Sequence, residues 1–217
     1  MWLTFKLAAT TTIILLAIGL PIAYFLANTT KWYTNIIETI VSMPLVLPPS
    51  VLGFYLLIAF SPSSTLGQFL TQNGISLAFS FEGLVIASVL FSLPFMVHPI
   101  QSALSNIPKS IYEASYTLGK SKFKTFLKVI LPMSKSGIIS GSVLAFAHTV
   151  GEFGVVLMIG GSLQGETKVA SIAIYDEVES LNYSMAHQYA LTLFVVTFAI
   201  LLLVYTLNKD SLKGGIK

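Results

Sequence analysis

The chain has 217 residues, of which 54% are hydrophobic and only 10% charged, and its mean hydropathy is +0.81. A soluble domain carries about 25% charged residues, so a water-soluble globular protein is excluded for most of the chain. The net charge of +3 comes from twelve lysines and nine acidic residues, and the lack of cysteine excludes disulfides and thiolate metal sites.

Five apolar stretches are long enough to cross a bilayer, which takes about 20 helical residues. They cover residues 5–27, 40–60, 84–104, 133–160 and 190–207. They do not show the alternating polarity of barrel strands. The sequence therefore predicts an all-α, polytopic membrane protein with about five transmembrane helices, in one domain that covers residues 1–217.

The first stretch, residues 5–27, could be misread as a signal peptide, with Lys6 as its one lysine. It is longer than the usual apolar core of such a peptide, and no Ala-x-Ala cleavage site follows it. We therefore expect a retained first span.

The second stretch, residues 40–60, is interrupted by Pro44, Pro48 and Pro49. Proline removes a backbone donor, and irregular backbone at membrane depth is tolerated where it lines a cavity. We expect a kinked helix that lines a pore. A kink without any role in a pore is the alternative.

The segment 108–132 is polar and rich in lysine, although it lies between two apolar stretches. A short helix is expected over Lys109–Leu118, with Gly119 as its stop. A second amphipathic helix is expected over Lys120–Ile130, with Phe123, Leu127 and Ile130 on one face. Pro132 should end this helix and begin the next span.

The fourth stretch, residues 133–160, holds a single carboxylate, Glu152, between Gly151 and Gly154. Ionisable groups inside a membrane tend to face the bundle interior or a water path. An ionised Glu152 would repel a dianion, so we expect a hydrogen bond to a backbone amide or a role in shaping the pore. The two glycines should allow close helix packing. A proton relay of His98, His148 and Glu152 is the less favoured alternative to structural histidines.

Lysine counts predict the orientation, because cytoplasmic loops retain basic residues. Residues 101–135 hold six lysines and one acid, and the C-terminal tail adds Lys209, Lys213 and Lys217 against Asp210. The loop 161–189 has one lysine and four acids. We expect the N-terminus outside, and the lysine-rich loop and the C-terminus in the cytoplasm. Contact with anionic lipid heads would also explain the lysines, whereas no aromatic-basic pattern indicates nucleic-acid binding.

The order Glu113-Ala114-Ser115, three residues, Gly119, nine residues, Val129, one residue, Leu131-Pro132 resembles the coupling loop of bacterial ABC importer permeases. That family has alanine in place of Ser115 and isoleucine in place of Val129. The resemblance implies that this loop contacts a cytoplasmic ATPase subunit. The implied coupling residues are Glu113, Ala114, Ser115, Gly119, Leu131 and Pro132.

The fourth stretch, with its core Gly151-Glu152-Phe153-Gly154, resembles the molybdate permease branch of that family. The second stretch and the loop after the fourth are similar to this branch as well. The resemblance implies molybdate import, with sulfate and tungstate as alternatives. The residues expected along the translocation path are Pro48, Pro49, Ser50, Thr149, Gly151, Glu152 and Gly154.

The resemblance also implies partners. We expect a homodimer, two cytoplasmic ATPase subunits, and a periplasmic or lipid-anchored oxyanion-binding protein, all at the bacterial inner membrane. The chain has no Gly-x-x-x-x-Gly-Lys-Ser/Thr phosphate loop. It should therefore hold no cofactor and catalyse no reaction, with ATP and Mg²⁺ bound by the partner ATPase.

Rival functions have weaker support. A proton-coupled secondary transporter would show inverted repeats or charges in several spans, and neither is visible. An intramembrane enzyme would need catalytic residues in its spans, and the sequence has neither a His-Glu-x-x-His motif nor paired aspartates within its apolar stretches. A membrane scaffold is disfavoured by the coupling-loop pattern.

Overall fold

Helices make up all the regular structure in the part of the chain that the computed structural model describes, residues 1–207. The lysines of the C-terminal tail lie outside these residues. The α-helices are α1 (Trp2–Asn28), α2 (Trp32–Ser42), α3 (Pro49–Phe60), α4 (Thr65–Gln72), α5 (Phe81–Ser105), α6 (Lys109–Thr117), α7 (Lys122–Thr125), α8 (Leu131–Met133), α9 (Lys135–Gly151), α10 (Gly154–Gly160), α11 (Ala170–Glu179) and α12 (Tyr183–Leu207). A 3₁₀ turn, η1 (Met43–Leu45), and a π turn, η2 (Phe126–Ile130), complete them.

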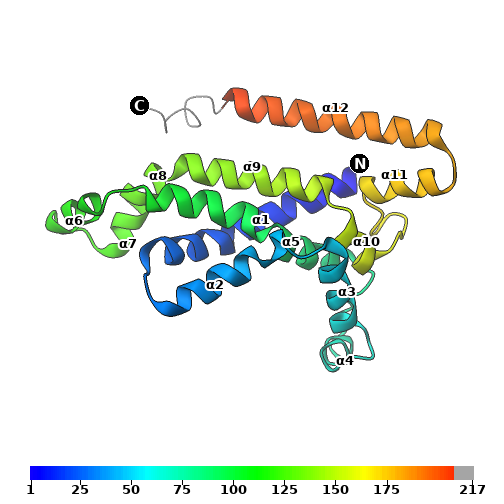
Figure 1. Cartoon of the computed structure of the whole chain (residues 1–217), viewed down its shortest axis with the longest axis horizontal. Coiled ribbons are helices and arrows are strands. Elements are labelled where there is room, and N and C mark those ends of the chain that lie inside the picture. The colour runs from blue at the N-terminus through cyan, green and yellow to red at the C-terminus, as the bar shows by residue number, and fades with distance from the viewer. Residues whose placement is uncertain (208–217) are drawn as a thin grey trace.

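Three helices, α1, α5 and α9, pack side by side along the long axis of the molecule (Figure 1). The short helices α6 and α7 lie at one end of this bundle, and α10 and α11 lie at the other. Helices α3 and α4 project to one side, and α12 runs along the outside next to α9. The two ends therefore carry different structures, joined by long helices.

The close packing of α9 on α5 rests on small residues four apart, Gly137, Gly141 and Ala145, all of which are buried. A Cβ atom added at Gly141 would lie 2.8 Å from the carbonyl oxygen of Met96 on α5. Such stripes let helix backbones approach each other in a membrane. Packed in this way on α5, helix α9 runs from the short-helix end of the bundle to the other end (Figure 1).

Helices α1, α5 and α12 are each long and apolar enough to cross a membrane. Two bent helix pairs bring the total to as many as five spans among the described residues. One pair is Trp32–Leu45 with Pro49–Phe60, bent by 107°, and the other is Lys122–Met133 with Lys135–Gly151, bent by 69°.

Two expected spans are broken more severely than the sequence indicated. The stretch 40–60 is not one kinked helix, because η1 follows α2 directly and α3 turns away after Pro48. Three prolines within six residues remove backbone donors and disfavour helical geometry at the preceding residues. The stretch 133–160 is likewise split, because the chain leaves the helix at Glu152 and Phe153 before α10 begins.

Candidate functional site

A pocket of about 620 Å³ opens where α9 ends and α10 begins. The start of α3, the middle of α5 and the break between α9 and α10 form its walls. The lining residues are Pro49, Ser50, Phe91, Ala147, His148, Gly151, Glu152, Phe153 and Gly154. Five of the seven residues expected along a translocation path meet here.

The other two expected path residues lie elsewhere. Thr149 is 2% exposed, and its hydroxyl donates to the carbonyl of Ala145 (2.9 Å) and pairs with the Ser92 hydroxyl (3.0 Å). Pro48 precedes α3 and does not line the pocket. The sequence did not single out Phe91, Ala147 or Phe153, because their place depends on how α5 and α10 pack.

Glu152 lies in the backbone break and is only 5% exposed. Neither of its carboxyl oxygens completes a hydrogen bond within residues 1–207, so the expected bond to a backbone amide is absent there. The Ser88 hydroxyl lies beside the carboxyl but is itself unsatisfied by ordinary hydrogen-bond geometry. The main-chain carbonyl of Glu152 accepts a bond of 2.6 Å from the Ser171 hydroxyl of α11.

The two glycines beside Glu152 differ in their surroundings. A Cβ atom on Gly154 would lie 2.9 Å from Cβ of Pro49, so this glycine lets α10 approach the start of α3. A Cβ atom on Gly151 would meet nothing within 4 Å. Close packing was expected for both glycines. Within this chain it holds for Gly154 alone, because Gly151 faces open space where α9 ends.

His148 has the ring contact and the hydrogen bond that are typical of a structural histidine. Its ring stacks on Phe95 with centroids 4.0 Å apart, and its Nδ1 atom lies 2.9 Å from the Ser92 hydroxyl. His98 pairs instead with the hydroxyl of Ser42, at 3.2 Å. No hydrogen bond joins either histidine to Glu152 among the described residues, so the structure provides no relay.

The segment expected to contact an ATPase forms a knob at the short-helix end (Figure 1). Helix α6 ends at Thr117, and Gly119 follows with a φ of +74°. Glu113 and Ala114 are exposed, whereas Ser115 is buried and its hydroxyl lies 2.8 Å from that of Thr125 in α7. This bond ties the two arms of the knob together.

The second arm of the knob departs from the expected helix. Its last part is the π turn, and Ile130 is fully buried while Phe123 is 71% exposed and Leu127 is 43% exposed. The three side chains therefore do not share one face, because a π turn holds more residues per turn than an α-helix and shifts the register. Helical backbone also continues through Pro132 to Met133, and the bend follows at Ser134.

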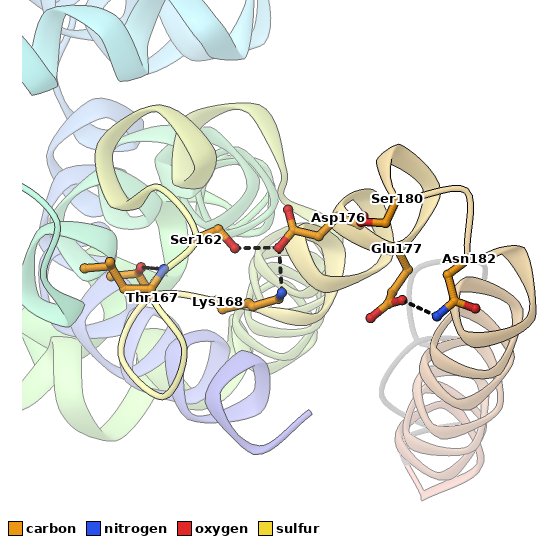
Figure 2. A network of polar contacts seen from close by, with 8 residues as sticks. Ser162, Thr167, Lys168, Asp176, Glu177, Ser180 and Asn182 are labelled. Atoms are coloured by element: carbon orange, nitrogen blue, oxygen red, sulfur yellow. Dashed lines mark hydrogen bonds and ion pairs between the residues drawn. The ribbon is translucent and has the colours of Figure 1, made fainter.

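A polar network joins the loop after α10 to α11 at the opposite end of the molecule (Figure 2). Asp176 of α11 accepts a bond of 2.6 Å from the Ser162 hydroxyl and forms an ion pair of 2.6 Å with Lys168. Burial by itself would raise the pKa of Asp176, but the hydrogen bonds from Lys168 and Ser162 and the charge of Lys168 lower it below its ordinary value. The network fixes α11, and Ser171 of that helix donates a hydrogen bond to the main-chain carbonyl of Glu152 in the backbone break.

No group of three or more His, Asp or Glu side chains within residues 1–207 is placed to hold a metal ion. The site is thus a membrane pocket with one buried acid, a knob at one end and a polar network at the other. The family model of the binding-protein-dependent transport system inner membrane component matches residues 19–211.

The chain belongs to this family. It is a transport component, with helices suited to a multi-pass place in the inner membrane. This inner-membrane component is 44% identical over 205 residues to the molybdenum transport system permease protein ModB of Azotobacter vinelandii, covering 94% of the chain and 91% of the relative. It is 32% identical over 201 residues to the probable sulfate transport system permease protein cysT of Zygnema circumcarinatum, covering 93% and 70% respectively.

Solved structures share the fold of this inner-membrane component. An inward-facing MetNI methionine ABC transporter superposes with a TM-score of 0.72 at 17% identity, covering 97% of this chain and 93% of that one. A bacterial ABC transporter for the import of alginate gives 0.74 at 19% identity, covering 96% and 78%.

Proposed function

We propose that the chain is the membrane-spanning permease subunit of an ATP-driven ABC importer that carries molybdate into the cytoplasm. The similarity to the molybdenum permease of Azotobacter vinelandii, which extends over nearly the full length of both chains, carries the choice of substrate. Sulfate is the second candidate because the sulfate permease of Zygnema circumcarinatum is also similar over most of this chain. Tungstate is the third, as an oxyanion of the same shape and charge as molybdate.

The geometry supports coupling between the two ends of the chain. Helix α9 starts one residue after the bend at Ser134 and ends at Gly151, beside Glu152 and the pocket. Its 17 residues span roughly 26 Å at 1.5 Å per residue. A rigid movement of the knob would therefore reach the pocket along a single helix.

The proposal includes the partners. Two copies of the chain form the path, because a two-fold dimer is the commonest closed assembly and one subunit supplies one wall. Two ATPase subunits contact the knobs and bind ATP and Mg²⁺, and this chain holds no cofactor and performs no hydrolysis. An oxyanion-binding protein delivers its cargo to the end that carries the Asp176 network.

The orientation follows from the same proposal. The N-terminus and the loop 161–168 face outward, and the lysine-rich knob faces the cytoplasm, where its cations also lie near anionic lipid heads. The C-terminus is placed in the cytoplasm.

Labelled molybdate uptake tests the proposal in cells that lack their own molybdate permease. The chain is expressed with its neighbouring ATPase and binding protein, and sulfate and tungstate are added as competitors. We expect ATP-dependent uptake that resists excess sulfate. Uptake abolished by sulfate would assign the chain to sulfate import.

The competing class, a proton-coupled secondary transporter, predicts uptake by this chain without an ATPase. Detergent extraction followed by affinity purification separates it from the importer and from a passive scaffold. The importer retains an ATPase in the purified complex, and the other two do not.

A further inference from the structure

The C-terminal end of α1 lies against both arms of the knob. The ring of Tyr24 meets that of Phe126, the first residue of the π turn, edge to face with centroids 4.8 Å apart. The hydroxyl of Tyr112 in α6 is buried beside the side chain of Asn28, the last residue of α1, without completing a hydrogen bond of ordinary geometry. Helix α1 therefore contacts α6 and the π turn, although neither adjoins it in the sequence.

These contacts are part of the hydrophobic core at this end of the molecule. The side chains of Tyr24, Tyr112 and Phe126 all pack against the buried cluster that includes Leu104 and Ile130. Ile130 is fully buried and is the last residue of the π turn. Closely packed side chains transmit a displacement to their neighbours because they leave little space to absorb it. A movement of the knob would therefore carry the end of α1 with it.

The other end of α1 is bonded to α11. The backbone N–H of Ala170, the first residue of α11, donates a hydrogen bond of 2.8 Å to the Thr4 hydroxyl. Both residues are buried, and Val169, which precedes α11, supplies no side-chain cap. The N–H groups in the first turn of a helix need acceptors from outside that helix. Thr4 therefore caps α11 from a distant part of the sequence.

Between these two contacts α1 is a single helix of 27 residues, roughly 40 Å long at 1.5 Å per residue. It continues without a break through Pro21. Its middle is packed closely on α5, since a Cβ atom added at Gly19 would lie 2.9 Å from Cγ of Met96. Helix α9 ends at the break beside the pocket, whereas α1 reaches α11 directly.

We propose that α1 is a second mechanical link between the knob and the opposite end of the molecule, with Tyr24 and Thr4 as the positioning residues at its two ends. Through Tyr24 the helix follows the knob. Through Thr4 it moves the start of α11, the helix that carries Asp176 and Ser171. This inference rests on the proposed importer function, and it adds a route by which docking of the binding protein at one end reaches the ATPase at the other.

The complete transporter, purified with its ATPase and reconstituted in liposomes, tests the link through the stimulation of the ATPase rate by the binding protein. Stimulation requires a signal to pass from the docking end to the knob, whereas a merely structural defect lowers assembly or the basal rate. We expect Tyr24→Ala and Thr4→Val to assemble, to keep the basal rate within about 2-fold, and to lower the stimulation by about 3- to 30-fold, the usual range for coupling between distant sites. Molybdate uptake per ATP hydrolysed should fall with it.

Conservative variants and matched controls separate coupling from packing. Tyr24→Phe keeps the ring and Thr4→Ser keeps the hydroxyl acceptor, so both should behave as the wild type. Tyr33→Ala removes another aromatic ring that stacks on the same end of α1, with centroids 6.1 Å apart. Thr12→Val removes a hydroxyl that bonds within α1 instead, to the carbonyl of Ala8 at 2.7 Å. Both controls should keep the stimulation of the wild type.

Unchanged stimulation in either Tyr24→Ala or Thr4→Val would overturn the link, and so would an equal loss in the two controls, which would indicate a general packing effect. If Tyr24→Ala does not assemble with the ATPase, Tyr24→Leu takes its place. Failure of that variant as well would show that the contact serves assembly alone, and the link would again be overturned.

The behaviour of the wild type separates this inference from the proposed function. A wild type that carries none of molybdate, sulfate and tungstate would overturn the proposed function and the link with it. A wild type that transports an oxyanion, with variants that transport it equally well, would overturn the link alone. If that oxyanion is sulfate, the substrate assignment is wrong and the variants are scored with sulfate.

Discussion

Gly119 turns the chain between the two arms of the knob with a φ of +74°, and a Cβ atom there would meet nothing within 4 Å. Space is therefore available for a side chain, but the backbone conformation disfavours one. Among non-glycine residues asparagine adopts this region most readily, and a β-branched residue is a clear outlier there.

We therefore expect Gly119→Val to lower ATPase binding and oxyanion uptake at least 10-fold, while membrane insertion remains normal. The strain costs of order 1–3 kcal/mol and displaces α6 from α7. Gly119→Asn is the control and should keep most of the activity. Co-purification of the ATPase and labelled uptake measure both variants, and equal activity of the two would contradict the role of the turn.

Glu113 projects from the knob into solvent and makes no side-chain bond within the described residues. Its replacement should leave the stability of the isolated chain nearly unchanged, because exposed substitutions usually fall within about 0.5 kcal/mol. We expect Glu113→Lys to weaken binding of the ATPase by reversing a charge at the contact. Glu179→Lys makes the same change on an exposed acid at the other end of the molecule. A similar loss in both variants would indicate a general charge effect and exclude a specific contact at Glu113.

At the level of elements, the sequence predicted the long helices but not the break between α9 and α10. The long apolar stretches predicted α1, α5 and α12 because a bilayer requires continuous helices of that length. The break at Glu152 and Phe153 was missed, since it depends on α10 packing against α3 and α5 through Gly154 and its neighbours. The sequence did indicate Glu152 and Gly154 as path residues, but it gave no sign that Phe91 of α5 would line the same pocket.

The stripe of small residues on α9 gives a stability prediction. Gly141→Ala places a Cβ atom 2.8 Å from a backbone carbonyl of α5, which cannot move without shifting the helix. We expect a loss of about 1–3 kcal/mol, as for other overpacked interiors. Gly151→Ala, on the same helix with open space around it, is the matched control. Thermal unfolding in detergent compares them, and equal midpoints would contradict the close α5–α9 contact.

The network that fixes α11 should respond to acid. The lowered pKa of Asp176 means that its bonds stabilise the folded loop above the ordinary carboxyl pKa of 3.8, and that this contribution is lost as the pH falls through the lower, folded value. We therefore expect the loop to hold at neutral pH and to loosen only in strong acid. Asp176→Asn should loosen it at pH 7, by about 0.5–1 kcal/mol for a pair of partly exposed side chains.

Amide hydrogen exchange of residues 160–180 measures this loosening. Faster exchange at pH 7 in Asp176→Asn, with exchange in α6 unchanged, would support the network as the anchor of α11. The same protection in the variant and the wild type would show that the bond of Ser171 to the Glu152 carbonyl is sufficient.

The whole molecule has two chemically different ends, separated by the length of α1, α5 and α9 (Figure 1). The knob carries lysines and a π turn, whereas the opposite end carries the Asp176 network and the pocket where α9 ends. A transporter needs this polarity, because energy is applied at one face and cargo enters at the other. The proposed orientation therefore assigns each end to one side of the membrane.

The absence of cysteine from the chain makes that assignment directly measurable. Two single substitutions, Lys122→Cys in the knob and Gln164→Cys in the loop after α10, are each labelled in intact cells with a membrane-impermeant maleimide. We expect Gln164→Cys to react at once and Lys122→Cys to react only after the membrane is opened, because loops rich in lysine stay in the cytoplasm. Both residues lie on the surface. The parent chain, which has no cysteine, is the negative control for labelling. The reverse pattern would place the knob outside the cell, where no ATPase could reach it, and would overturn the importer proposal together with its orientation.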